Sequence, residues 1–254
     1  MNNNLQKALY DYLLWMGDTT LVLGHRISEW CGHGPILEED IALTNIALDL
    51  LGQARLYLTY AGEVEGKGRT EDDLAYLRDV MDYRNSLLVE QLNGDFANTI
   101  VRQFLFTAFS YHLQEALLSS TDERIRSIAE KAIKEVTYHL RHSSDWMIRL
   151  GDGTEESHAK VQNGLNDIWM FVDDLFVMLP GDKLLVDEKI IPDMGSIRKK
   201  WNETVKNVLD EATLNMPTEA YMMKGGRESK HSEHLGYILT ELQFLQRAYP
   251  GAKW

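Results

Sequence analysis

The stretch KEVTYHLRH, from Lys134 to His142, carries residue types that bind metal ions. Glu135 precedes His139 by four residues, so the two side chains should lie on one face of a helix, one turn apart. His139 also falls on the apolar stripe that should face the core. A carboxylate and an imidazole at this spacing suit either half of a metal site or a hydrogen-bonded core pair, and the core pair is the commoner arrangement.

A second group of polar residues interrupts the apolar helices nearer the N-terminus. The string IALTNIALDLLGQA is apolar on almost every face, which predicts a central helix, and Asn45, Asp49 and Gln53 form a line along it. A buried Asp is costly unless it is paired, protonated or bound to metal. The preceding helix adds three further polar residues: Asp18, His25 and Glu29. Together with KEVTYHLRH, these patterns predict that three helices bring acidic or imidazole groups towards a shared interior.

Such an interior suggests the di-iron site of ferritin-like bundles. That site takes one Glu from each of two helices and a Glu-x-x-His from each of the other two. Neither Asp49 nor Glu135 is followed by a histidine three residues later, and no carboxylate stands between Asp95 and Glu115 in the fourth predicted helix. The inward positions of that helix are neutral: Gln103, Thr107 and Ser110. The sequence therefore predicts an incomplete di-iron site.

The periodicity of the apolar residues predicts an all-α fold with no strands. Four helices should be about 25 residues long, which is typical of a bundle. We expect a single ferritin-like domain over residues 1–254, with a core four-helix bundle at about 5–150 and additional helices at about 154–249. The expected helices run 5–31, 38–61, from 70 to about 91, 95–119, 122–150, 155–178, 196–214 and 232–249.

Short polar signals mark where these helices begin. Thr70 and Asp73 have the spacing of a capping box, and Asp95 and Asp122 are N-cap residues of the two helices that follow them. In KHSEHLG, His231 begins a polar turn that we expect to fix the last helix rather than to bind metal.

Composition limits the partners and the compartment. The 254 residues include 44% hydrophobic residues, and the formal net charge of −13 argues against a nucleic-acid or anionic-membrane surface. The single cysteine, Cys31, excludes a disulfide framework or a cysteine-based metal site within the chain. No basic region precedes an apolar leader, and no apolar run reaches the ~20 residues of a membrane span. We expect a cytoplasmic protein.

Several longer strings together resemble one family, the C subunits of the bacterial phenylacetyl-CoA epoxidase, also called ring-1,2-phenylacetyl-CoA monooxygenase. The similarity extends in the same order from Thr19 to Trp254. The strings are LVLGHRISEWCGHGPILEEDIALTNIALDLLGQAR, LVEQLNGDFANTIVRQF, KAIKEVTYHLRHSSDW, EATLNMP, HSEHLG and LQFLQRAYPGAKW.

The resemblance implies a ferritin-like fold and a role in aerobic phenylacetate breakdown. It implies a related catalytic subunit that holds the di-iron centre and binds phenylacetyl-CoA, and a reductase whose flavin and iron–sulfur cluster deliver electrons from NADPH. The C subunit is then a structural partner without a cofactor or catalytic residues of its own. Four residues match polar positions near the former site: Glu29, Asp49, Glu135 and His139.

Three functions follow as hypotheses. The first, which we expect, is a non-catalytic scaffold in which those four residues form a polar network that replaces metal coordination, with Arg26 or Arg55 neutralising a carboxylate. The second is a divergent di-iron oxidase that acts alone, and the third is an iron- or ligand-binding module of the ferritin type. We expect homodimers when the chain is alone and a heterodimer with the catalytic subunit when both are present.

Overall fold

The computed structural model describes residues 3–218 and 221–252. All regular structure in these residues is helical, with nine α-helices and no strand, which confirms the predicted all-α fold class. Trp254, which ends the last family-like string, lies outside the described residues, as do residues 1, 2, 219, 220 and 253. None of the described helices combines the length and the hydropathy needed to cross a membrane.

The four predicted long helices are present as α1, α2, α4 and α5, with 26, 29, 22 and 29 residues. The α-helices in chain order are α1 (Asn3–Ser28), α2 (Leu37–Glu65), α3 (Glu71–Tyr76), α4 (Phe96–Leu117), α5 (Glu123–Gly151), α6 (Glu155–Ile168), α7 (Asp182–Asp187), α8 (Met194–Glu211) and α9 (Glu233–Ala248).

Two predicted helices are wrong in length. The third was expected to reach about residue 91, but α3 ends at Tyr76, and two 3-10 turns at Val80–Asp82 and Leu87–Glu90 follow it. There the backbone bonds to side chains instead, as when Arg84 N–H donates to the Asp18 carboxylate. The sixth was expected to reach residue 178, but α6 gives way to a 3-10 helix at Trp169–Phe176. Its aromatic rings pack on Trp201, with ring centroids 5.8 and 5.5 Å away.

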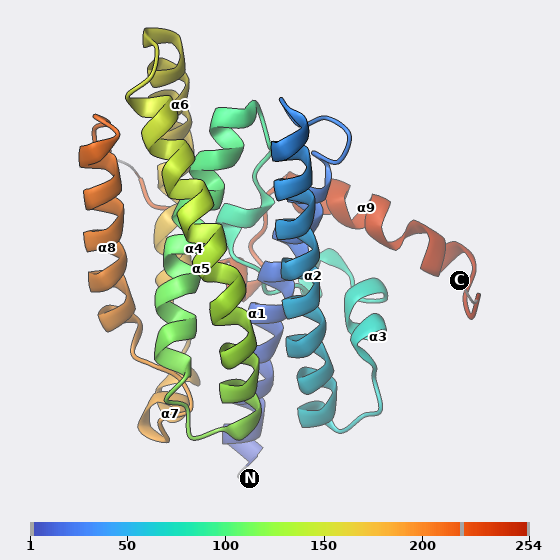
Figure 1. Ribbon diagram of the computed structural model, residues 1–254. Helices are drawn as coiled ribbons and strands as arrows, with labels where there is room; N and C mark the ends of the chain where they lie inside the picture. The colour runs from blue at the N-terminus through green and yellow to red at the C-terminus, as the bar shows by residue number, and fades with distance from the viewer. Residues whose placement is uncertain (1–2, 219–220, 253–254) are drawn as a thin grey trace. The chain divides into compact units, whose positions relative to one another are not determined.

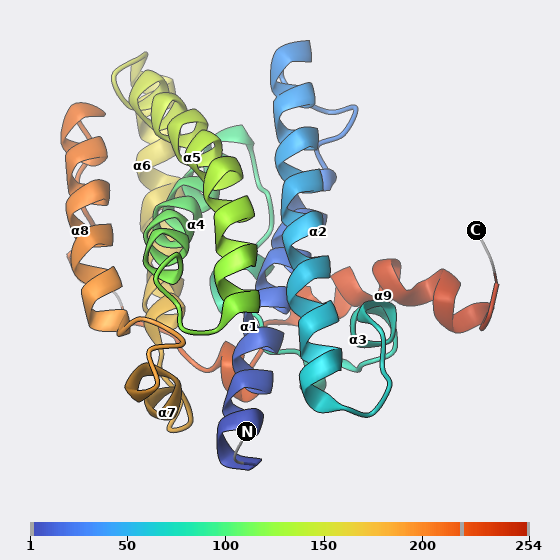
Figure 2. The same ribbon diagram turned by 60° about the horizontal axis from the view of Figure 1, so that its bottom comes forward.

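The described helices fall into two compact units, each made of segments that are far apart in the sequence. The first unit contains Met1–Gln91, Leu179–Leu185 and Gly225–Trp254, and the second contains Leu92–Met178 and Val186–Lys224. In the first unit α1 and α2 run antiparallel and side by side, and α3 and α9 pack against one another (Figures 1 and 2). In the second unit α4 and α5 run antiparallel, and α6 and α8 pack against them (Figure 1). The single-domain organisation stays a prediction.

Close packing of α1 on α2 depends on a glycine. A Cβ atom at Gly17 would lie 2.6 Å from Cδ2 of Leu58, so any larger residue here would force the Leu58 side chain to move. Leu9, Leu13 and Val22 of α1 are fully buried, which places the core of the first unit along this contact. Gly17 and Leu58 therefore fix the spacing of the two helices.

The predicted helix starts are confirmed at the level of hydrogen bonds. The Asp95 and Asp122 carboxylates accept the N–H groups of residues 98 and 125, at 2.9 and 3.0 Å. Thr70 and Asp73 form the predicted capping box. The connection between α4 and α5 is short, spanning residues 118–122, so these helices are antiparallel neighbours.

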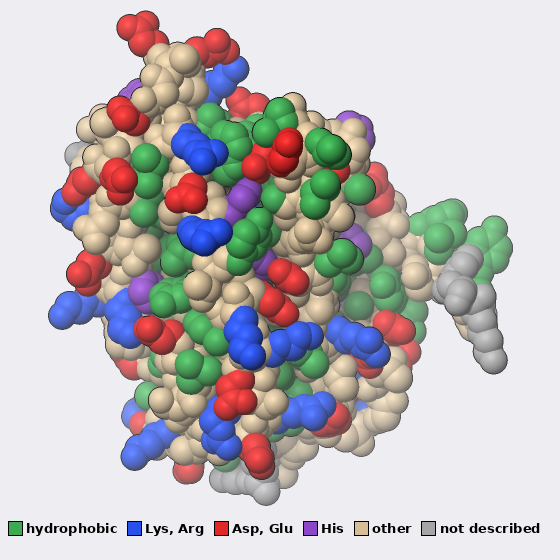
Figure 3. Space-filling view, in the orientation of Figure 1, with side chains coloured by type: hydrophobic (Ala, Val, Ile, Leu, Met, Phe, Trp, Pro, Cys, Tyr) green, Lys and Arg blue, Asp and Glu red, His purple; other side chains and the backbone are tan. Residues whose placement is uncertain are grey.

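The predicted central helix, α2, is buried on one face only. One face packs inward through Leu43, Ile46 and Leu50, which are fully buried. The opposite face is open to solvent, because Ile41 is 53% and Leu48 is 61% exposed. Figure 3 shows hydrophobic side chains around the upper end of this helix, with acidic side chains among them. The all-round apolar pattern was misleading because a helix buried on all sides and one with an exposed apolar face have the same composition.

Candidate functional site

The predicted site residues are divided between the two units. Glu29 and Asp49 belong to the first unit, and Glu135 and His139 belong to the second. Glu29 follows the end of α1 with its side chain 43% exposed, and it accepts a 2.8 Å hydrogen bond from Arg26. Arg26 is therefore a partner of a predicted site carboxylate, as one hypothesis expected. Asp49 is half-buried on α2.

The stripe on α5 that contains His139 is confirmed. His139 is fully buried and Glu135 is half-buried one turn earlier. One turn beyond, the Ser143 hydroxyl lies 3.0 Å from the Thr107 hydroxyl of α4, and it donates to the His139 carbonyl oxygen at 2.8 Å. His139 is thus part of the buried face by which α5 packs in its unit. A direct contact between Glu135 and His139 stays a prediction.

The inward face of α4 is buried and uncharged, as the sequence indicated. Gln103 and Thr107 are fully buried and Ser110 is 2% exposed. The side-chain amide of Gln103 has no hydrogen-bond partner among the described residues. Two iron ions take several carboxylates and imidazoles, so this donor set does not fit a di-iron centre. Across residues 3–218 and 221–252, no three His, Cys, Asp or Glu side chains gather where they could hold a metal ion.

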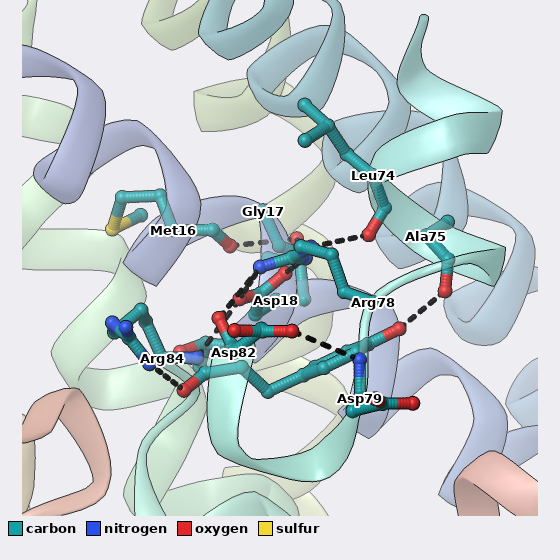
Figure 4. A network of polar contacts seen from close by, with 12 residues as sticks. Met16, Gly17, Asp18, Leu74, Ala75, Arg78, Asp79, Asp82 and Arg84 are labelled. Carbon is teal, nitrogen blue, oxygen red and sulfur yellow. Dashed lines mark hydrogen bonds and ion pairs between the residues drawn. The ribbon is translucent and has the colours of Figure 1, made fainter. Parts of the chain in front are cut away.

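The polar residues of α1 do not share one site, which corrects the expected shared interior. Asp18 is fully buried and forms a two-point ion pair with Arg78, whose Nη1 lies 3.0 Å from Oδ2 (Figure 4). Arg78 also donates to the carbonyl oxygens of Leu74 and Asp82, at 2.5 and 3.0 Å. A buried carboxylate is stable only with such partners. Asp18 therefore holds the turn after α3 against α1.

A second buried ion pair lies in the same unit. Arg227 donates to both oxygens of Asp182, at 2.6 and 2.9 Å, and both side chains are at most 3% exposed. The Arg227 guanidinium also lies 4.3 Å from the centre of the Trp15 ring, at cation–π distance. The pair therefore links the segments of Asp182 and Arg227 to each other, and the contact with Trp15 attaches both to α1, although all three are far apart in the sequence. Sequence reasoning missed it because nothing near either residue marks its partner.

A third buried pair anchors the start of α9. Glu90 is fully buried, and its carboxylate accepts hydrogen bonds from Asn85 at 2.9 Å and from Ser232 N–H at 2.7 Å. The His231 ring contacts the same carboxylate through Nδ1, and its Nε2 donates to the Tyr83 carbonyl oxygen at 3.0 Å. The predicted polar turn that fixes the last helix is confirmed.

His25, the remaining polar residue of α1, lines a cavity between α1, α2 and α3. The cavity has a volume of about 260 Å³ and apolar walls that include Leu21 and Leu58, with Arg55 and Glu71 at its edge. Burial lowers the pKa of His25, so its imidazole is held towards the neutral form. Arg55 pairs with Glu71 at 3.2 Å and not with a predicted site residue.

Comparison with known proteins agrees with the family-like strings. A family described as "Phenylacetic acid catabolic protein" matches residues 1–254. The C subunit of the 1,2-phenylacetyl-CoA epoxidase of Escherichia coli (strain K12) is 48% identical over 243 residues, which cover 96% of this chain and 98% of that protein. The fold of the family is ferritin-like and helical, in agreement with the predicted fold class. The chain therefore belongs to the phenylacetic acid catabolic protein family.

Proposed function

We propose that this chain is the non-catalytic structural subunit of a multicomponent phenylacetyl-CoA epoxidase, in which it supports the related di-iron catalytic subunit during aerobic phenylacetate degradation. The observation that carries the proposal is the 48% identity to the C subunit of an epoxidase, over 96% of this chain and 98% of that protein. A similarity that spans nearly all of both chains favours the same place in the same assembly.

The side chains on the buried face of α4 support the absence of catalysis in this chain. The buried face of α4 offers an amide and two hydroxyls, from Gln103, Thr107 and Ser110, where a di-iron site needs a carboxylate. Glu29 is engaged by Arg26, and an arginine at 2.8 Å competes with any cation for that carboxylate. Both features support the hypothesis that Glu29, Asp49, Glu135 and His139 are vestiges of a metal site.

The proposal assigns the cofactors to other chains. The di-iron centre belongs to the catalytic subunit, and the flavin and the iron–sulfur cluster belong to the reductase. This chain pairs with the catalytic subunit in the cytoplasm and forms homodimers when it is alone. What it contributes is a cofactor-free framework, held in its first unit by two buried ion pairs, Asp18–Arg78 and Asp182–Arg227, and by the buried hydrogen-bonded contact of Glu90 with His231.

Metal analysis with and without the catalytic subunit tests the proposal. The chain purified alone should contain iron well below one ion per chain, and Asp49→Ala should leave that content unchanged. The complex should contain iron, and NADPH-dependent oxygen uptake with phenylacetyl-CoA should require both subunits and the reductase. Omitting only this chain should abolish that uptake.

Other outcomes would identify the alternatives. Near-stoichiometric iron in the isolated chain that is lost in Asp49→Ala would contradict the non-catalytic role. Oxygen consumption by this chain alone, with iron and a reductant, would favour an independent di-iron oxidase. Iron binding without turnover would favour an iron-binding module.

A further inference from the structure

The imidazole of His25 lines the cavity between α1, α2 and α3 without a hydrogen-bond partner among the described residues. Its carbonyl oxygen accepts bonds from the Ser28 hydroxyl and the Glu29 N–H, but the ring takes part in neither. Burial lowers the pKa of His25, and no charged side chain among the described residues adds to that shift. Polar groups turned away from water normally find a partner. The half-buried ring therefore offers the cavity a hydrogen-bonding group that the fold does not use.

The walls of this cavity, which we call the His25 cavity, are mainly apolar. They include Leu21 of α1, Leu51, Ala54 and Leu58 of α2, and Ala75 of α3. All three helices belong to the first unit, so packing within that unit forms the cavity. Its volume is about 260 Å³. Because an apolar cavity of about 150 Å³ is large enough to hold benzene, the His25 cavity has room for a single ring with one small substituent.

The charged residues at the rim of the His25 cavity disfavour a charged occupant. Arg55 and Glu71 pair with each other at 3.2 Å, and Asp72 is exposed next to Glu71. An anion would meet two carboxylates and an arginine that is already engaged. A cation held at the rim would leave the His25 ring without a partner. A neutral hydroxyl matches a neutral imidazole, because each both donates and accepts a hydrogen bond.

We propose that the His25 cavity binds a small neutral molecule with one ring and one hydroxyl group, as in phenol, whose hydroxyl forms a hydrogen bond with the His25 imidazole. The ring packs against the leucine side chains of α1 and α2. Burial of the ring provides the affinity, and the single polar contact provides the selectivity. This site goes beyond the proposed function and does not depend on it, because every test uses the isolated full chain.

Isothermal titration calorimetry with phenol tests for the site. Phenol should bind at one molecule per chain with a dissociation constant of about 1 mM or tighter, which is within reach of so small a ligand. Benzoate carries a carboxylate on the same ring, and it should bind at least tenfold more weakly because the rim offers it no unpaired cation. No saturable phenol binding in the millimolar range, or equal affinity for phenol and benzoate, would overturn the proposal.

His25→Leu tests the hydrogen bond, since it removes the imidazole but keeps a side chain of similar size. Toluene has a methyl group where phenol has its hydroxyl, so the ratio of the two affinities isolates the polar contact. That ratio should fall about tenfold in His25→Leu, because the phenol hydroxyl is left buried and unpaired. His33→Leu is the matched control at an exposed histidine of the same unit, and it should keep the ratio within twofold. An unchanged ratio in His25→Leu would contradict the assigned contact.

Two substitutions that fill the cavity test its position independently of His25. Ala54 is 1% exposed and lines the cavity, so the side chain of Ala54→Leu should extend into it. Leu51→Trp fills the same space from a half-buried position and serves if Ala54→Leu does not fold. Each folded variant, checked by circular dichroism, should bind both phenol and toluene at least tenfold more weakly than the wild type. Unchanged phenol binding in a folded variant would place the ligand elsewhere and would overturn the proposal.

Discussion

Arg78 connects several buried groups of the first unit, although no sequence pattern marked it. Its guanidinium bonds Asp18 and the carbonyl oxygens of Leu74 and Asp82, and it lies 4.5 Å from the centre of the Tyr83 ring. Its side chain is only 4% exposed. A buried pair of this kind adds little net stability as a pair, but removing one partner leaves an uncompensated charge.

We predict that Arg78→Ala lowers the free energy of unfolding by about 3–5 kcal/mol. The reason is that the fully buried Asp18 carboxylate loses its cation. Urea unfolding at neutral pH measures the change. Lys206→Ala is the control. The pair of Lys206 with Asp210 is more than half exposed, so losing it should lower the free energy of unfolding by less than about 1 kcal/mol. Similar losses in the two variants would contradict the assigned role of Arg78.

At His139 the prediction concerns packing. His139→Ala should lower the free energy of unfolding by about 2–4 kcal/mol, because it leaves a cavity at a fully buried position. Thr137→Ala, on the exposed side of the same helix, should change it by at most about 0.5 kcal/mol. A double-mutant cycle with Glu135→Ala would measure the predicted coupling between Glu135 and His139, and a coupling of zero would contradict the pair.

At the scale of elements, the end of α2 is fixed by charge as well as by backbone geometry. Gly66 ends the helix in the left-handed conformation, with φ 71°. Glu65, the last helical residue, accepts hydrogen bonds from Arg69 at 2.6 and 2.7 Å and from Lys67 at 3.2 Å. The bonds from Arg69, followed by the bond from Lys67, lower the pKa of Glu65 from 4.5 to about 2.

This pKa predicts how the α2 terminus responds to acid. Glu65 binds a proton more readily in the unfolded chain than in the folded one. The ionised Glu65 carboxylate therefore stabilises the folded state above about pH 4.5, and this stabilisation is lost as the pH falls towards about 2. Glu65→Gln should therefore lower the free energy of unfolding at pH 7 by about 1–2 kcal/mol. The difference from the wild type, measured by urea unfolding, should shrink below about pH 4.5. A difference independent of pH would show that Glu65 does not act through its charge.

At the scale of the whole molecule, net charge opposes self-association. The chain carries a formal charge of −13, so two copies repel one another. We predict that the homodimer of the isolated chain becomes tighter as salt concentration rises, because salt screens this repulsion. Sedimentation velocity at low and high salt measures the change, and the same measurement with the catalytic subunit added detects the heterodimer. Monomers at every salt concentration, with no association on adding the catalytic subunit, would contradict the predicted partnerships.

The sequence by itself determined the four long helices, several of the helix starts and part of what these helices bury. The α5 stripe with His139, the caps at Asp95 and Asp122, and the uncharged inward face of α4 all follow from residues within a few turns of one another. Such patterns are readable because helix periodicity and capping are local.

Tertiary structure alone decided which charges meet and which apolar face stays open. Asp18 pairs with Arg78, 60 positions away, and Glu90 with His231, 141 positions away. No local pattern selects one arginine or histidine among several at such distances, because the choice depends on how helices pack. For the same reason, only the packing of α2 showed that Ile41 and Leu48 face solvent and not the core.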